Sequence, residues 1–168
     1  MRSPRIKTTE ESTCYHLLSR TSRGVFLFGD SEKEQMRSLL WRTARFCGIE
    51  IITYALMSNH FHLLVRVPAK AAADAALTDA EVLDRMSEFR SDMEMGILKR
   101  GAELAGEMQR KLAAGEGVDV NTKNWGENWL AVRESMVAQM HEVSQFMKLF
   151  KQRVGIWFNR SKATYANP

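Results

Sequence analysis

The sequence has few cysteines and no long apolar run, and these absences exclude several classes of protein. Its two cysteines, Cys14 and Cys47, do not form a CxxC pair, so we expect neither a disulfide scaffold nor a zinc finger. The apolar runs span only a few residues, too few for a transmembrane helix. The polar segment 1–12 is not followed by the apolar stretch of a secretory signal. We therefore expect a cytoplasmic protein without membrane contact.

The sequence also lacks several common catalytic and nucleotide-binding motifs. It contains no GxGxxG after a predicted strand, no Walker motif, no GxSxG and no HExxH. We therefore do not expect a dinucleotide-binding protein, a P-loop nucleotidase, a serine hydrolase with a nucleophile elbow or a zinc protease of the HExxH type.

Positive charge is concentrated at the C-terminal end of the sequence. The formal net charge is +4, and the segment 141–168 carries this whole surplus. Its basic residues are Lys148, Lys151, Arg153, Arg160 and Lys162, and its acidic residue is Glu142. Such a segment favours contact with a polyanion, nucleic acid first, although a solvated helix face is the alternative.

The first part of the sequence predicts the order strand, helix, strand, strand. Three segments have the pattern of a strand: 14–19, 49–57 and 60–67. The helix is expected to begin near Asp30 with a capping box of Ser31 and Glu34, and to end at Gly48. Because a turn signal separates the last two strands, we expect them to form an antiparallel hairpin.

The rest of the sequence predicts helices and no fourth strand. A capping box of Thr78 and Glu81 opens a helical run to about Ala114. The glycines and asparagines of 115–127 predict a loop, and an apolar heptad stripe predicts one long helix over 129–158. We therefore expect an α+β fold in four parts: a flexible arm (1–12), a core (13–68), a variable helical insertion (69–127), and a long basic helix and tail (128–168).

One histidine pair in the last predicted strand is suited to metal binding. His60 and His62 share one face of this strand, because residues two apart point the same way. The opposite face is apolar and fits a core. Two neutral imidazoles side by side can hold one divalent cation, with a third ligand supplied from elsewhere. A surface pair without a ligand is the alternative.

Three strings in this sequence resemble the single-tyrosine HUH transposases, in particular the REP-associated group and its insertion-sequence relatives. They are Tyr15-His16-Leu17-Leu18-Ser19-Arg20, Phe26-Leu27-Phe28-Gly29-Asp30 and Tyr54-Ala55-Leu56-Met57-Ser58-Asn59-His60-Phe61-His62-Leu63-Leu64-Val65. Segments within 141–161 are similar to the helix that precedes the C-terminal part of that group.

The resemblance implies a ferredoxin-like antiparallel sheet and a metal-assisted reaction on single-stranded or hairpin DNA. His60 and His62 match the family's metal-binding pair, and the metal would be Mg²⁺ or Mn²⁺. In the family, this metal polarises a scissile phosphate while a tyrosine attacks the phosphorus, giving a 5′-phosphotyrosine and a free 3′-OH. The expected DNA contacts are the basic residues of the histidine face and the C-terminal helix: Arg20, Arg66, Lys148, Lys151, Arg153 and Arg160.

The family's nucleophilic tyrosine has no clear counterpart here. In the family the tyrosine follows a Leu-Trp…Arg-Phe segment. This sequence ends with Tyr165-Ala166-Asn167-Pro168 at the place where that segment would begin. We therefore expect a C-terminally shortened chain, in which Tyr165 is the one mobile candidate nucleophile. Tyr15 and Tyr54 are expected to lie in strands. His16 is a candidate third ligand, provided that the first strand neighbours the third.

Three functions stay open from the sequence. The chain is a transposase of this class or its shortened remnant, or a non-catalytic module that binds single-stranded or hairpin DNA, or a metal-dependent hydrolase of another substrate. Without a fourth strand, the first strand is an open edge. A homodimer or the N-terminal arm would cover that edge.

Overall fold

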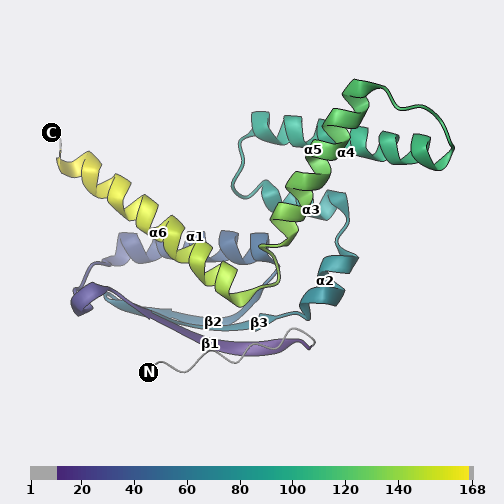
Figure 1. Ribbon diagram of the computed structural model, residues 1–168. Helices are drawn as coiled ribbons and strands as arrows, with labels where there is room; N and C mark the ends of the chain where they lie inside the picture. Colours follow the sequence, from purple (N-terminus) through teal and green to yellow (C-terminus); the bar gives the residue numbers. More distant parts are fainter. Residues whose placement is uncertain (1–10, 167–168) are drawn as a thin grey trace. The chain divides into compact units, whose positions relative to one another are not determined.

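The candidate site lies on a three-stranded antiparallel sheet that has helices on one face (Figure 1). The computed structural model describes residues 11–166 of the chain. Contacts divide the chain into two units, one within Met1–Ala75 and Met140–Pro168 and the other Ala76–Gln139. The elements in chain order are β1 (Thr13–Arg20), a 3-10 turn (Ser22–Gly24), α1 (Asp30–Cys47), β2 (Glu50–Leu56), β3 (His60–Val67), α2 (Lys70–Ala76), α3 (Asp79–Met86), α4 (Asp92–Ala113), α5 (Val120–Val137) and α6 (Val143–Ala166).

The sheet has the order β1-β3-β2, with β3 antiparallel to both neighbours. This arrangement confirms the predicted strand, helix, strand, strand order, the β2–β3 hairpin and the α+β class. Within residues 11–166 no fourth strand pairs with β1, which therefore lies at an edge of the sheet. No helix in the part of the chain that the structure describes is long and apolar enough to cross a membrane.

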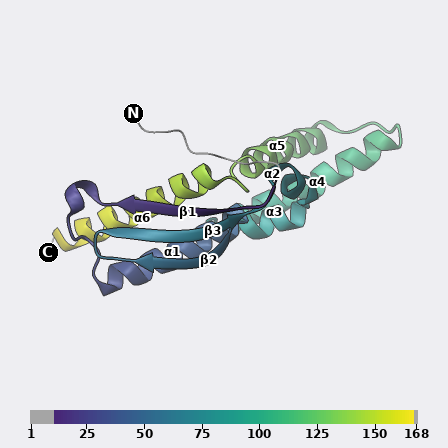
Figure 2. The ribbon, with the colours of Figure 1, turned by 90° about the horizontal axis from the view of Figure 1, so that it is seen from below.

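The core of the first unit lies between the sheet and two helices. Leu63 and Val65 on β3 are completely buried, as are Phe146 and Phe150 on α6. The rings of Phe61 and Phe150 meet edge to face with their centroids 5.3 Å apart. Figure 2 shows the strands in front of α1 and α6, so both helices cover the same face of the sheet. The apolar alternation of β3 decides which face this is.

The predicted capping box at the start of α1 is wrong. The N-cap residue is Gly29, whose backbone N–H donates to Glu32 Oε2 at 3.1 Å. Ser31 lies inside the first turn, and Glu34 pairs with Arg37 instead. Glycine is a favoured N-cap residue, and the reciprocal contact from the third helical position forms without a Ser or Thr side chain.

The predicted loop over 115–127 is confirmed only to Asp119 and is wrong beyond it, because α5 begins at Val120. Asp119 caps this helix by accepting a hydrogen bond from Thr122 N at 3.0 Å. Gly126 does not break α5 but allows α4 to approach closely: a Cβ there would lie 3.1 Å from the Cα of Ala105. The glycine that indicated a loop is therefore a packing residue between two helices.

The single long helix expected over 129–158 is interrupted before α6. His141 has a φ of 50° and leaves the helical path. Its N–H donates to the Cys47 carbonyl at 2.7 Å, and its Nδ1 lies 2.8 Å from Asp74 Oδ1. Lys70 donates to the Met140 carbonyl at 2.9 Å. These contacts outweigh the local helical propensity. Within α6 the buried residues of the predicted apolar stripe are Val143, Met147, Phe150 and Val154.

The end of α1 gives a first stability prediction. Gly48 has a φ of 62° and donates its N–H to the carbonyls of Ala44 and Arg45. Gly48→Ala is expected to lower the free energy of unfolding by about 1 kcal/mol, because a Cβ is strained in this conformation. The matched control is Gly155→Ala within α6, where an added Cβ meets no atom within 4 Å.

That control is expected to raise stability by about 0.5–1 kcal/mol, because alanine favours a helix more than glycine does. Urea unfolding followed by circular dichroism measures both variants. Changes of the same sign in the two variants would contradict the assignment of Gly48 as the helix terminator.

Candidate metal centre and nucleic-acid interface

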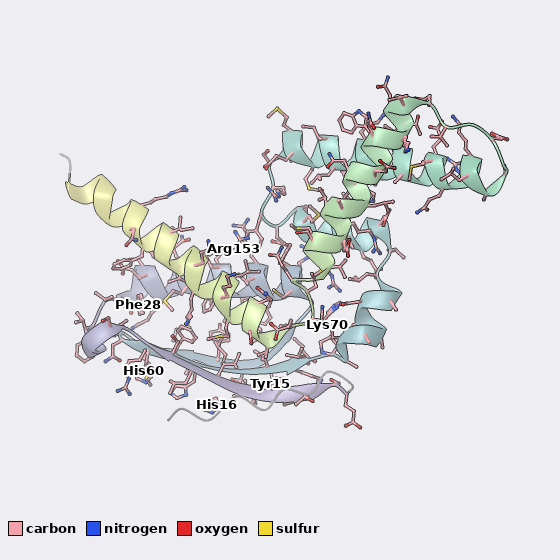
Figure 3. The ribbon with its side chains drawn as sticks, viewed as in Figure 1. Tyr15, His16, Phe28, His60, Lys70 and Arg153 are labelled. Carbon is pink, nitrogen blue, oxygen red and sulfur yellow. The ribbon has the colours of Figure 1, made fainter. Side chains whose placement is uncertain are left out.

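The face of the sheet away from α1 and α6 carries the predicted histidines. Because cross-strand partners share a face, the register assigns each side chain to one side of the sheet. The side chains on this open face are Cys14, His16, Leu18 and Arg20 of β1, and His60, His62, Leu64 and Arg66 of β3. In Figure 3, His16 and His60 lie on the side of the strands opposite α6.

His60 and His62 lie side by side on β3, as the two-residue spacing predicts. Both side chains are half-buried. Their ring centroids are 5.4 Å apart and the ring planes are inclined by 78°. Both residues therefore keep part of their surface accessible, on a face that no helix of the first unit covers within residues 11–166.

Asn59 holds the first of these histidines and was not identified from the sequence. Its side-chain Oδ1 lies 2.6 Å from His60 Nδ1. Its Nδ2 donates to the Gly24 carbonyl at 3.0 Å, which fixes the direction of the amide group. Asn59 directly precedes His60 in the sequence, but the sequence pattern there predicts only a turn.

His16 reaches the second histidine, because β1 neighbours β3. His16 Nε2 and His62 Nδ1 are 2.9 Å apart, which is hydrogen-bond distance. The ring planes differ by only 16° and the centroids are 5.1 Å apart. That separation is about the nitrogen–nitrogen distance plus the radii of two imidazole rings. The rings are therefore nearly coplanar and meet edge to edge.

The three histidines do not form a ready ligand set. Among the described residues, no group of three His, Cys, Asp or Glu side chains is arranged to hold a metal ion. The contact with His62 occupies Nε2 of His16. A third protein ligand is thus not identified at this site.

Arg20 and Arg66, both predicted to bind DNA, lie at opposite ends of the open face. Arg20 is exposed and directly opposite His60 in the β1–β3 register. Arg66 is six residues farther along β3, roughly 20 Å away, and its Nη1 contacts Glu50 Oε2 at 2.7 Å. Hydrogen bonding to Cys14 and the charge of Glu50 raise the pKa of Arg66 above its ordinary value. Arg20 is therefore the arginine beside the histidines.

The basic residues predicted on the C-terminal helix lie on α6, in the layer behind the sheet. Lys148, Lys151 and Arg160 are exposed and Arg153 is half-buried. Lys151 and Arg20 both line a pocket of about 200 Å³ at the end of the sheet where β1 stops. The other residues that line this pocket are mostly apolar, among them Leu27, Phe28 and Phe61.

Both strand tyrosines lie on the wrong face to serve this site. Tyr15 pairs with Val65 and Tyr54 with Leu63, so both residues belong to the helix-covered face. Tyr54 meets Trp41 of α1 edge to face, with centroids 6.3 Å apart. The backbone of α6 is helical to Ala166, so Tyr165 lies in the last turn of a helix and not in a mobile tail. The side chain of Tyr165 lies outside the described residues.

Comparison with known proteins identifies a relationship for the strand–helix–hairpin region. A protein-family model described as Transposase IS200 like matches residues 9–79, fewer than half of the chain. No curated protein and no solved structure gives a significant match. The family match confirms the relationship predicted from the three sequence strings, and it covers all three histidines of the open face.

Proposed function

From the relationship of residues 9–79 to the IS200-like transposases, we propose that this chain acts on single-stranded or hairpin DNA as a transposase-like protein of the single-tyrosine HUH class. The observation that carries the proposal is the open sheet face, where His60 and His62 lie side by side with Arg20 opposite His60. We further propose that β1, α1, β2 and β3 are the first four elements of a ferredoxin-like arrangement.

In this proposal His60 and His62 hold Mg²⁺ or Mn²⁺. The donor set suits such an ion in part. Two imidazoles on an accessible face supply two ligands, and Mg²⁺ sites commonly complete their coordination with water and substrate phosphates. Imidazole suits Mn²⁺ better than Mg²⁺, so the tighter of the two complexes is expected with Mn²⁺. When bound, the ion would polarise a phosphate oxygen of the DNA.

The DNA is proposed to run from the open face around the end of the sheet. Arg20 lies opposite His60 in the strand register, and Lys151 lines the same pocket as Arg20. The exposed Lys148 lies about one turn before Lys151 on α6, and we propose it as a further contact; the exposed Arg160, nine residues after Lys151, lies on the opposite side of the helix and is proposed as a weaker one. We propose Arg66 and Arg153 as weaker contributors, because Arg66 is engaged by Glu50 and Arg153 is half-buried.

A second candidate function is binding without cleavage. It is favoured by the position of Tyr15 and Tyr54 on the helix-covered face, away from the histidines. In this alternative the chain retains the metal and DNA sites but places no nucleophile at them. We also propose a homodimer, since the outer edge of β1 has no partner strand within residues 11–166.

Salt-dependent binding tests the nucleic-acid part of the proposal. We expect the affinity for a single-stranded oligonucleotide to fall roughly 20- to 50-fold between about 50 and 200 mM salt, as three or four phosphate contacts would give. Fluorescence anisotropy measures this for single-stranded, hairpin and duplex DNA. An affinity that does not change with salt would contradict phosphate contact.

A single substitution locates that contact. Arg20→Ala is expected to reduce the slope of log affinity against log salt by about 0.7, the share of one phosphate contact on a single strand. Arg100→Ala is the matched control, since Arg100 is an exposed arginine of α4, paired with Glu103 at 3.1 Å. An equal change in the two variants would show that Arg20 has no special place in binding.

A further inference from the structure

The hydrogen bonds behind the two histidines constrain which ring nitrogens are available to a ligand. A neutral imidazole carries one N–H and one lone pair, so a partner on one nitrogen decides the state of the other. His60 and His62 each have such a partner on Nδ1, namely Asn59 and His16. These partners come from the turn before β3 and from the neighbouring strand β1.

The contact between Asn59 and His60 has only one possible direction. Asn59 Nδ2 donates to the Gly24 carbonyl, so Oδ1 is the atom that faces His60. An amide oxygen can only accept, and Nδ1 of His60 must therefore carry the proton. In the neutral ring, Nε2 is then left with its lone pair and without hydrogen. This is the state in which a histidine nitrogen binds a metal.

The contact between His16 and His62 has two possible directions. If His62 Nδ1 donates to His16 Nε2, then His62 Nε2 keeps a free lone pair, as in His60. If His16 donates instead, His62 Nε2 carries the proton and cannot bind a metal. The nearly coplanar, edge-to-edge rings allow either arrangement to form a well-aligned hydrogen bond at 2.9 Å.

We propose that Asn59 and His16 are positioning residues, which hold His60 and His62 in the Nδ1–H tautomer so that both rings offer Nε2 to the same cation. Metal-binding histidines commonly donate their second N–H to such a partner, which fixes the tautomer and the ring orientation. This inference rests on the metal role proposed above for the pair. It assigns His16 to the support of His62 and not to the third ligand position.

The test is a long-range ¹H–¹⁵N correlation spectrum of histidine-labelled protein without metal or DNA, at about pH 8.5, where imidazoles are neutral. The sequence has four histidines, so single variants assign the signals. We expect the Nδ1–H tautomer for both His60 and His62. The Nε2–H tautomer for either ring in the wild-type protein would overturn the proposal for that ring.

Variants then separate positioning from general folding effects. In Asn59→Ala, His60 is expected to move toward the Nε2–H tautomer, and Mn²⁺ affinity to fall at least 10-fold. Asn59→Asp keeps an acceptor beside His60 but loses the donor to Gly24. It is therefore expected to restore both the tautomer and the affinity. If the Asp variant behaves like the Ala variant, the contact of Asn59 with the Gly24 carbonyl, and not the His60 tautomer, determines the Mn²⁺ affinity. The proposal then fails.

The same comparison applies to the second ring. His16→Gln retains an acceptor for His62 Nδ1, whereas His16→Leu does not, so only the Leu variant is expected to lose the His62 tautomer and Mn²⁺ affinity. The exposed residue Asn159 of α6 supplies the control, Asn159→Ala, which should change neither quantity. The spectra need no DNA, so the two proposals can fail separately. If both rings show the expected tautomer but the protein does not bind DNA, the proposed function is refuted and the positioning role of Asn59 and His16 is not.

Discussion

Replacing His60 and His62 together with alanine is expected to abolish detectable Mn²⁺ binding. The loss should exceed about 100-fold, because removing the ligands costs more than the 10- to 100-fold that removal of an outer partner typically costs. Both side chains lie on the open face, opposite the buried Leu63 and Val65. The double variant should therefore keep its fold.

Isothermal titration with Mn²⁺ measures this effect. Thr53→Ala is the matched control. Thr53 lies on the neighbouring strand β2, is exposed, and is on the open face of the sheet because it pairs with Leu64. That control should bind Mn²⁺ as the wild-type protein does. Equal heats in the wild-type protein and the double histidine variant would end the assignment of the metal to this pair.

The second large effect is expected in catalysis: the 168-residue polypeptide should form no detectable covalent adduct with single-stranded DNA. A nucleophile must lie ~3–3.5 Å from the phosphorus and in line with the leaving oxygen, and such positioning is worth effective molarities of about 10⁵–10⁸ M. Tyr15 and Tyr54 belong to the helix-covered face. Tyr165 lies in the last turn of α6, and this helix packs behind the sheet. No tyrosine is therefore expected at the phosphate.

The measurement is incubation of the protein with labelled single-stranded DNA and Mn²⁺, followed by denaturing electrophoresis. An adduct that is present in the wild-type protein and absent in Tyr165→Phe would contradict the prediction and identify Tyr165 as the nucleophile. An adduct that persists in Tyr165→Phe and disappears in Tyr15→Phe or Tyr54→Phe would contradict the facial assignment of the strand tyrosines.

The elements around the histidines could be predicted because their signals are local. The alternation of 60–67 determines which side of β3 is buried, and this places His60 and His62 together on the other side. Gly48 ends α1 because the chain needs a left-handed residue there. The family resemblance and the strand order agree with these local patterns.

Other features depend on contacts between residues far apart in the sequence. Gly126 indicated a loop, yet it lies within α5 because α4 approaches it closely. The break before α6 depends on contacts of His141 with Cys47 and Asp74. His16 and His62 are 46 residues apart, and only the register of β1 against β3 brings their nitrogens to 2.9 Å. The pairing of Arg66 with Glu50 likewise depends on the register of β2 against β3.

The most direct test of the central proposal, a metal held by His60 and His62 against a DNA phosphate, is pulsed electron paramagnetic resonance of bound Mn²⁺ with ¹⁵N-histidine-labelled protein and a single-stranded oligonucleotide. We predict couplings to two imidazole nitrogens and to ³¹P, with the nitrogen couplings lost in the His60→Ala/His62→Ala variant. Bound Mn²⁺ without imidazole coupling, or with couplings that survive in the double variant, would contradict it.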